Sequence, residues 1–324
     1  MSGPLVSVVI ATWNTARFLP EALSGALGQT WPNLEVIVVD DGSTDDTAHV
    51  IRPFLPRIRY ERRSHQGLAA ARNEGIRLAL GDYIALLDAD DLWLPDKIAV
   101  QMEIATRHPE TGLVACNAVE FDGDRILYES LLFEPFLRAI AASPSGEVTA
   151  DFQRDLIAGT GIASPSQVLI PRRVLGEIGP FVGSGAQDYD YYLRVSRSFP
   201  ITVHHHQLAK WRYRPDSMSG ENADRPIRWG LFALPVLLAH RERCRPEYRH
   251  LLEARIGRSI ASLAYGLMTR GRESGRLDAT RHLLGLLRMR PWPPTALLYL
   301  AGLWSPKVVF RTGARLTRAW RAAE

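Results

Sequence analysis

The sequence of 324 residues has only two cysteines, Cys116 and Cys244, which lie far apart and in no CxxC or Cys/His pattern. A disulfide framework and a structural zinc site are therefore unsupported, and two reduced thiols are expected. Long apolar runs are also missing. The best candidate, residues 295–304, stops at Ser305-Pro306-Lys307, whereas a membrane-spanning helix needs about 20 residues. Residues 1–4 carry no basic segment typical of a secretory signal, so we expect a cytoplasmic protein.

The overall composition is that of an ordinary soluble globular protein, with 46% hydrophobic and 23% charged residues. This excludes a disordered, a collagen-like or a wholly membrane-embedded chain. The length allows one large domain with a smaller one, or two modest domains.

Charge divides the chain into two parts. Residues 1–225 hold 21 basic and 29 acidic residues, a net charge of −8, whereas residues 226–324 hold 18 and 6, a net charge of +12. We therefore expect two domains, 1–225 and 226–324. The basic part is suited to an anionic membrane surface or to nucleic acid. The alternative is an arginine-rich helical surface in contact with solvent.

Short apolar runs alternate with helical patterns in the first part of the chain. Residues 6–10, 34–39 and 83–87 predict buried strands, and residues 16–28 and 67–80 predict helices. This alternation favours an α/β fold with a mainly parallel sheet flanked by helices. Further strands are predicted at 58–60, 113–117, 167–170, 201–203 and 211–214. From about residue 226, leucine and arginine at helical spacing predict a C-terminal α-helical extension.

Acidic clusters follow two of the predicted strands. Asp40 and Asp41 end one strand, and Asp88, Asp90 and Asp91 end another. Because ligands bind at the carboxyl ends of strands in such sheets, both clusters are expected on one edge. Like charges held together need compensation, which a divalent metal would provide. The alternative is that these aspartates form turns and helix caps.

Five motifs appear in an order and spacing that resemble a bacterial family 2 glycosyltransferase. The resemblance covers roughly residues 5–219 and implies a GT-A fold (the fold of nucleotide-diphospho-sugar transferases), a nucleotide-sugar donor, a divalent metal and inversion at the anomeric carbon. A later segment, Gln187 to Arg194, resembles the acidic motif of that family. The motifs are Val6 to Asn14, Asp40-Asp41-Gly42-Ser43-Thr44-Asp45, Gly67 to Asn73 with Gly75, Gly81-Asp82-Tyr83-Ile84, and Asp88 to Pro95.

The resemblance assigns the metal and the donor. The DxD element of the family matches Asp88-Ala89-Asp90, which makes Asp90 the expected ligand of Mn²⁺ or Mg²⁺. Asp88 would meet the ribose, or the metal through water. Asp91 could instead cap the next segment. The residues expected to bind the nucleotide-sugar are Ala11, Trp13, Asn14, Asp41, Gly67, Arg72, Asp88 and Ala89.

Three of these residues have distinct expected roles. Asp41 should accept from the base, most simply from the N3–H of uracil. Trp13 would stack on that base, or would be a core aromatic residue beside the strand. Arg72 would approach the phosphates, or would form a surface salt bridge.

The catalytic base is expected at Asp188, which matches the aspartate of the family's ED or GD motif. The preceding residue is Gln187, where glutamate is common, so this chain carries one charge fewer there. A base on the face opposite the leaving diphosphate would take the proton of the acceptor hydroxyl as the new bond forms. Asp190 is expected to cap or orient the helix.

Two segments have no assigned chemistry. Residues 204–206 are three histidines, but neighbouring residues on a strand point to opposite faces, which disfavours one shared metal ion. Residues 288–311 combine aromatic and basic side chains and resemble an interfacial segment. The alternative for that segment is a helical bundle packed on the catalytic domain.

These observations predict transfer of a sugar from an NDP-sugar, UDP most simply, to a glycan or lipid-linked acceptor in cell-surface polysaccharide synthesis. The enzyme would be cytoplasmic, or peripheral on the cytoplasmic face of the inner membrane, and nucleic acid is not an expected partner. A sugar nucleotidyltransferase is disfavoured because residues 11–15 form no glycine-rich basic loop. An inactive glycosyltransferase-like protein that binds membrane or nucleic acid through its basic tail is the other alternative. The retained Asp41, Asp90 and Asp188 argue against it.

Overall fold

The computed structural model describes residues 3–159, 161–183, 185–215, 217 and 225–274. The chain divides into two compact units, Met1–Arg214 and Pro215–Glu324. The predicted helices at 278–288 and 293–303 and the aromatic-basic segment 288–311 lie outside the described residues.

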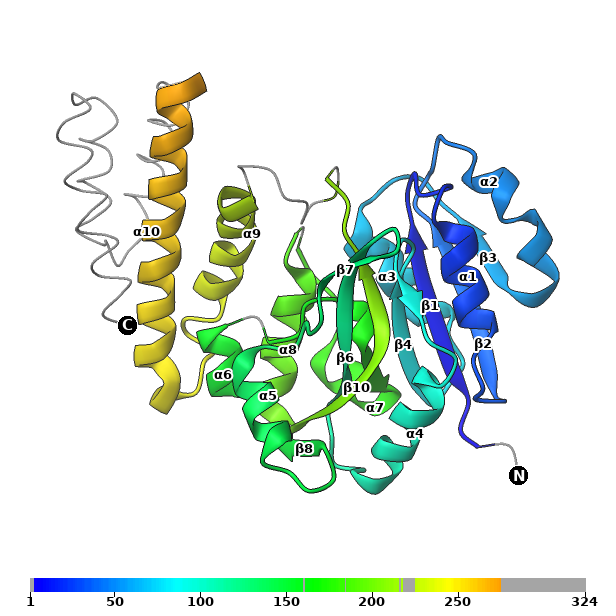
Figure 1. Cartoon of the computed structure of the whole chain (residues 1–324), viewed down its shortest axis with the longest axis horizontal. Helices are drawn as coiled ribbons and strands as arrows, with labels where there is room; N and C mark the ends of the chain where they lie inside the picture. Colours follow the sequence, from blue (N-terminus) through cyan, green and yellow to red (C-terminus); the bar gives the residue numbers. More distant parts are fainter. Residues whose placement is uncertain (1–2, 160, 184, 216, 218–224, 275–324) are drawn as a thin grey trace. The chain divides into compact units, whose positions relative to one another are not determined.

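The first unit is an α/β structure (Figure 1). Its elements, in chain order, are β1 Val6–Thr12, α1 Leu19–Leu27, β2 Leu34–Asp40, α2 Thr47–Val50, the 3₁₀ helix η1 Arg52–Arg57, β3 Arg59–Arg62, α3 Leu68–Leu78, β4 Tyr83–Asp88, β5 Leu92–Trp93, α4 Lys97–Arg107, β6 Leu113–Asp122, β7 Arg125–Tyr128, α5 Glu134–Ala141, β8 Glu147–Ala150, α6 Gln153–Ala158, η2 Pro165–Gln167, β9 Val168–Pro171, α7 Arg172–Ile178, α8 Gln187–Ser198 and β10 Ile201–Arg212.

The strands form one sheet in the order β3-β2-β1-β4-β9-β6-β10-β5, with β7 beside β6 and β8 beside β10. Strands β3, β2, β1 and β4 are parallel, as are β6 and β10. β9 runs antiparallel to both of its neighbours, β4 and β6. The expectation of a mainly parallel sheet flanked by helices is confirmed.

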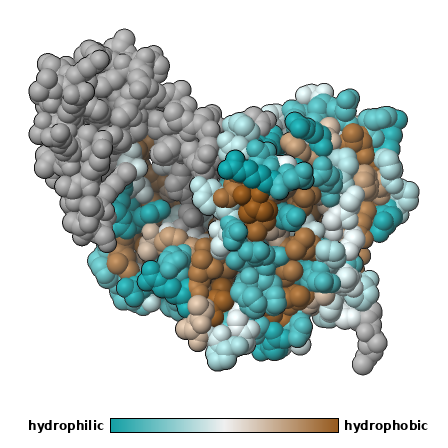
Figure 2. Space-filling view, viewed as in Figure 1, coloured by the Kyte–Doolittle hydropathy of each residue, from teal (hydrophilic) through white to brown (hydrophobic). Residues whose placement is uncertain are grey.

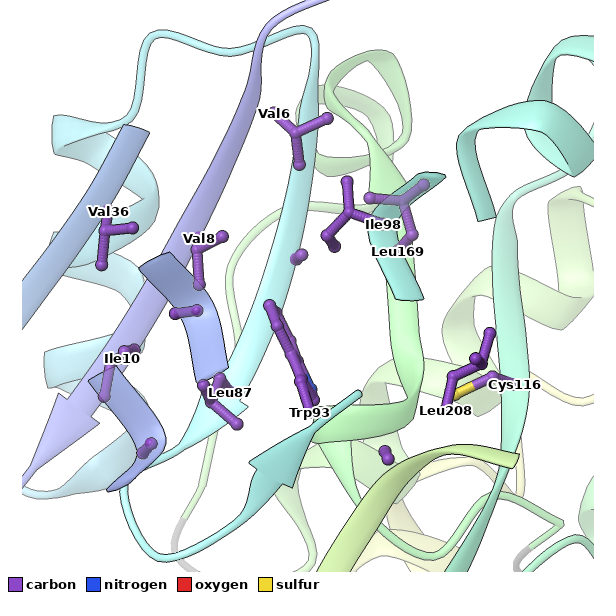
Figure 3. Packing of buried hydrophobic residues seen from close by; sticks show 14 of the residues in the cluster. Val6, Val8, Ile10, Val36, Leu87, Trp93, Ile98, Cys116, Leu169 and Leu208 are labelled. Carbon is purple, nitrogen blue, oxygen red and sulfur yellow. The ribbon is translucent and has the colours of Figure 1, made fainter. Parts of the chain in front are cut away.

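The first strand is buried along its whole length because helices cover both faces of the sheet. One face packs against α1 and α4 in a cluster that includes Val8, Leu23 and Ile98. In Figure 3, Trp93 lies near the middle of this cluster, between Leu87 on one side and Leu208 on the other. The sheet edge that carries the acidic residues is therefore held by a continuous apolar core.

Helix α3 packs closely on the other face of β1. A Cβ atom at Gly75 would clash with the side chain of Val9, so glycine permits this approach. Gly67, which precedes the first residue of α3, has a φ of 94°, a backbone conformation that glycine adopts without strain. These two glycines set the position from which α3 presents Arg72.

The second unit contains α9 Arg225–Ala239, the 3₁₀ helix η3 Pro246–Tyr248 and α10 Arg249–Ser274. Its buried side chains include Leu234 and Leu237 of α9 and Leu252, Ile256 and Ile260 of α10. Within the described part of the chain, no helix combines the length and apolar character needed to cross a membrane. On the face shown in Figure 2, hydrophobic residues lie interspersed among hydrophilic ones.

Candidate functional site

The acidic clusters lie at one edge of the sheet, as predicted. Parallel pairing places Thr12 of β1 opposite Asp40 of β2, and Ala11 opposite Asp88 of β4. Because the three strands are parallel, their carboxyl ends and the loops that follow them meet at the same edge. Ala11 is buried between Val39 of β2 and Asp88 of β4 and contributes backbone at this edge.

The loops after β1 and β2 are hydrogen-bonded to each other through Asn14. This residue has a φ of 54°, the left-handed conformation that asparagine tolerates better than most residues. Its N–H donates to Ser43 Oγ at 2.9 Å, and its Oδ1 accepts from the N–H of Thr44 at 2.8 Å. The side chain of Asn14 therefore fixes one loop against the other.

The carboxylate of Asp41 is buried and already has protein donors. Its oxygens accept the N–H of Gln66 at 2.9 Å and of Gly67 at 2.7 Å, just before α3. His65 Nδ1 lies 2.9 Å from Asp41 Oδ2, and the His65 ring stacks on Trp13 with 4.6 Å between centroids. Trp13 is 50% exposed, so the alternative of a core aromatic residue is wrong.

Arg72 is buried among the carboxylates. Its Nη2 lies 2.5 Å from Asp88 Oδ1, and its side chain is 5% exposed, so the alternative of a surface salt bridge is wrong. Burial alone would lower the pKa of Arg72, but Asp88 and then Asp188 raise it above its usual value. Arg72 is therefore a charged group that pairs with Asp88 of the DxD segment and interacts electrostatically with Asp188 at the start of α8.

Asp188 lies at the beginning of α8, where its Oδ1 accepts the N–H of Tyr189 at 2.9 Å. Burial raises the pKa of the Asp188 carboxyl, and Arg72 opposes this in part. Gln187 is 2% exposed, and its Oε1 has no hydrogen-bond partner among the described residues. Asp190 forms an ion pair with Arg194 at 2.8 Å, one turn along the helix.

Asp90 has an arginine partner. Arg214 Nη1 lies 2.9 Å from Asp90 Oδ2, and the Asp90 side chain remains 24% exposed. Burial, and after it the nearby Asp88, raise the pKa of Asp90, while Arg214 opposes the shift. The neighbouring Ala89 is buried, which keeps this turn packed against the core.

Asp91 is committed to holding the loop. It is fully buried, and its Oδ2 accepts hydrogen bonds from Ser166 Oγ at 2.6 Å and Ser164 Oγ at 3.0 Å. Its Oδ1 accepts the N–H of Arg212 at 3.0 Å. Burial and the two other aspartates raise its pKa well above the usual value. The three bonds tie the DxD turn to η2 and to the end of β10.

A divalent ion fits this donor set in a limited way. Asp88 and Asp90 present partly exposed carboxylates, the oxygen ligands that Mg²⁺ and Mn²⁺ prefer. Among the residues that the structure describes, there is no group of three or more His, Cys, Asp or Glu side chains arranged to hold a metal. At most two carboxylates are thus available to an ion. Its other ligands would come from water and from the phosphates of a bound nucleotide.

The three histidines do not follow a simple strand alternation. His204 is fully buried, whereas His205 and His206 are exposed, and the pairing of β10 with β6 shifts register between His204 and Gln207. Burial lowers the pKa of His204 to about 3, so this ring is neutral. No group of three or more metal-binding side chains among the described residues includes these histidines.

Sequence reasoning missed His65, Ser164, Ser166 and Tyr192. The first three act through contacts with Asp41 and Asp91 that join segments 24 to 75 residues apart, and a single sequence carries no signal for them. Tyr192 does have a signal, because it lies four residues after Asp188 on a helix and therefore on the same face.

The family model described as "Glycosyl transferase family 2" matches residues 7–178. An uncharacterized glycosyltransferase of Rickettsia felis is 29% identical over 237 residues, 71% of this chain and 38% of that relative. Chondroitin synthase of Escherichia coli is 37% identical over 103 residues, 31% of this chain and 15% of that relative. The chain spans 24% to 38% of the length of the first three curated relatives it matches.

Solved glycosyltransferase structures share the fold. S. aureus TarS 1-349 is 15% identical with a TM-score of 0.62, and the match covers 99% of this chain and 92% of that one. Mannosyltransferase PcManGT from Pyrobaculum calidifontis, in complex with GDP-Man and Mn²⁺, is 20% identical with a TM-score of 0.61, covering 93% and 86%. At these identities the likeness concerns the fold, and the expected GT-A-like fold is confirmed.

Proposed function

Because the chain belongs to glycosyl transferase family 2, we propose that it moves a sugar from an NDP-sugar, with UDP as the nucleotide, to a glycan or lipid-linked acceptor in cell-surface polysaccharide synthesis. The observation that carries this proposal is the buried charge cluster in which Arg72 pairs with Asp88 and faces Asp188. The cluster brings the expected donor segment and the expected base, a hundred residues apart in the chain, to one place.

Asp188 is proposed as the general base of an inverting transfer. The acceptor oxygen would attack the anomeric carbon on the face opposite the diphosphate, the bond from that carbon to the phosphate oxygen would break, and Asp188 would take the acceptor's proton. The raised pKa of the buried Asp188 carboxyl supports this role, because it brings the base closer to the operating pH. The hydrogen bond from Tyr189 N–H orients the carboxylate.

The nucleotide would lie over the loops after β1 and β2. The exposed Trp13 offers a ring face for the base, backed by the stacked ring of His65. Asp41 is proposed to accept from the base, and Asn14, Ala11, Ala89 and Gly67 to shape the backbone around the donor. Asp41 already accepts hydrogen bonds from two backbone N–H groups. The base would therefore donate to one of the remaining lone pairs of its carboxylate.

Asp90, with Asp88 beside it, would hold Mn²⁺ or Mg²⁺ at the diphosphate. When bound, such an ion stabilises the negative charge of the departing nucleoside diphosphate. Arg214 pairs with Asp90 and Arg72 pairs with Asp88. Both arginines would contribute positive charge near the phosphates of the donor. The neighbouring PcManGT, solved with GDP-Man and Mn²⁺, supports this proposal by analogy of fold.

The basic segment 226–324 is proposed to bring the enzyme to an anionic membrane surface, where a lipid-linked acceptor would be located. Its net charge of +12 supports this role, and residues 288–311 would form the contact. The charge also suits a binding module without catalysis, the second candidate. Vesicle binding that survives while donor turnover is absent would favour that candidate.

Calorimetry tests the donor site directly. UDP, GDP, CDP and dTDP would each be titrated into the full chain with Mn²⁺ and with EDTA. A metal-dependent preference for UDP is expected. A folded protein that binds none of the four nucleotides would contradict the proposal.

A further inference from the structure

The hydroxyl group of Tyr192 is buried and has no hydrogen-bond partner within the described part of the chain. The side chain is fully buried in α8, and its hydroxyl makes no hydrogen bond to any residue that the structure describes. Leaving a buried hydroxyl unsatisfied costs about 1–3 kcal/mol, a cost that phenylalanine at the same position would avoid. Packing alone therefore does not explain a tyrosine here, and a bound water, ion or ligand is the usual partner of such a group.

The phenol of Tyr192 lies within electrostatic range of the carboxylates of the site. Tyr192 follows Asp188 by one helical turn, so both side chains lie on the same face of α8. The phenol interacts electrostatically with Asp188, with Arg72 and with Asp88, yet hydrogen-bonds none of them. Burial first, and then Asp188, raise its pKa well above the usual value, so the group is a neutral hydrogen-bond donor.

The preceding residue provides a natural contrast. Tyr191 is also fully buried, and its hydroxyl likewise bonds none of the described residues. Its ring stacks on Phe181 with 4.2 Å between centroids, and Arg194 lies 5.1 Å from the ring centre. Arg194 is the charged group that acts on the pKa of Tyr191. The two tyrosines thus share their chemistry and burial but differ in the charged groups that act on their phenols.

The chemistry of the groups around the Tyr192 hydroxyl selects its binding partner. Carboxylates only accept hydrogen bonds, and the neutral phenol can donate one, so a group between them must accept and donate at once. A sugar hydroxyl does both, whereas a phosphate oxygen only accepts and could not donate to Asp188, and the cation Arg72 is already paired with Asp88. The reacting acceptor hydroxyl is a poorer match, because a hydrogen bond accepted from Tyr192 would withdraw electron density from the oxygen that attacks.

We propose that Tyr192 is a specificity-determining residue whose hydroxyl donates a hydrogen bond to a hydroxyl of the donor's sugar, between Asp188 and Asp88. This assignment rests on the proposed function. It predicts that the enzyme discriminates among donor sugars through a tyrosine of the Gln187–Arg194 motif to which the resemblance assigns no role.

Matched phenylalanine variants of the full chain test the assignment. Tyr192→Phe and Tyr191→Phe remove the same atom from adjacent buried positions, and both should keep the wild-type melting temperature or slightly raise it. Release of UDP would be measured with UDP-glucose, UDP-galactose and UDP-N-acetylglucosamine. For the donor that wild type uses, Tyr192→Phe should lose about 10- to 100-fold in kcat/KM with unchanged affinity for free UDP, and Tyr191→Phe should match wild type.

Deoxy donors identify the bond itself. Wild type should have a lower kcat/KM with the analogue that lacks the contacted hydroxyl, by the same factor as Tyr192→Phe loses with the complete donor. The kcat/KM of Tyr192→Phe should fall little further when it is given that analogue. Full additivity of the two losses for every deoxy position would overturn the assignment, as would equal rates for the two phenylalanine variants. Absence of UDP release by wild type with every UDP-sugar would overturn the proposed donor, and the role of Tyr192 with it.

Discussion

Replacing Asp188 with asparagine should stop sugar transfer and at the same time stabilise the folded chain. Burial raises the pKa of this carboxyl, and Arg72 offsets only part of the effect, so the ionised form lowers stability. Asparagine has no charge to desolvate, and its Oδ1 can still accept the N–H of Tyr189. A residue kept for folding alone would show the opposite sign, because its removal would destabilise the protein.

The size of the two effects can be worked out. Between the ordinary carboxyl pKa of 3.8 and the raised native pKa of Asp188, the native state holds more protons than the unfolded state, so stability falls as pH rises. The advantage of asparagine therefore grows through this window and is constant above it, at about 1.4 kcal/mol for each unit of raised pKa. One kcal/mol shifts the melting temperature of a unit of this size by about 2–4 °C. Loss of a general base should cost about 10²- to 10⁴-fold in kcat.

Asp190→Asn is the matched control on the same helix. Asp190 pairs with Arg194 at 2.8 Å, so its replacement should cost about 1.5–3 kcal/mol of stability and leave transfer intact. Melting would be followed by circular dichroism from pH 5 to pH 8, and turnover by release of UDP. A lower melting temperature of Asp188→Asn at pH 8 would refute the electrostatic reasoning. Normal turnover in that variant would remove Asp188 as the base.

Three further outcomes are expected. Asp90→Ala should lose the Mn²⁺-dependent part of UDP binding in calorimetry, and unchanged affinity would count against Asp90 as the metal ligand. Trp13→Ala should weaken UDP binding about 5- to 150-fold, the range of a lost base stack, while leaving the melting temperature unchanged because the ring is 50% exposed; a stability loss without a binding loss would contradict its role. Lys97→Met should gain about 3 kcal/mol at pH 7 from removal of the charge, since burial lowers the pKa of Lys97 to about 8, and should lose about 1–3 kcal/mol where Gln101 Oε1 is left without its hydrogen bond. The part of the stability difference that comes from the charge should disappear between about pH 8 and 10.5, because the unfolded chain binds the proton there and the folded chain does not. Stability would be measured by urea unfolding. A difference that stays constant over this pH range would argue against a charged Lys97.

The sheet and its acidic edge could be predicted because both depend on local patterns. A run such as Val6–Thr12, apolar on both faces, suits only a covered strand. Asp41 and Asp88 then fall at strand ends whatever the details of packing. By contrast, the predicted strand at 201–203 and the first two residues of the one predicted at 211–214 belong to a single strand, β10, which ends at Arg212. A register shift and three histidines break the apolar pattern of this strand.

The partners of the acidic side chains could not be predicted, because they come from distant segments. Asp91 accepts from Ser164 and Ser166, more than 70 residues away, and this satisfies its carboxylate in a way that no local motif announces. Arg72 was expected to face either phosphates or solvent, yet it is buried against Asp88. Such contacts depend on how α3 and η2 pack on the sheet, which a single sequence does not specify.

The arginines change the meaning of the clustered aspartates. The sequence alone predicts that like charges at one edge require a metal for compensation. In the structure, Asp88 pairs with Arg72 and Asp90 pairs with Arg214. Asp91 accepts hydrogen bonds from two hydroxyl groups. The protein therefore compensates these carboxylates with its own groups, and their clustering alone does not call for a cation. What calls for one is the proposed donor, because a diphosphate adds about two negative charges beside carboxylates that are already paired. Metal dependence should accordingly belong to nucleotide binding, and folding should not share it.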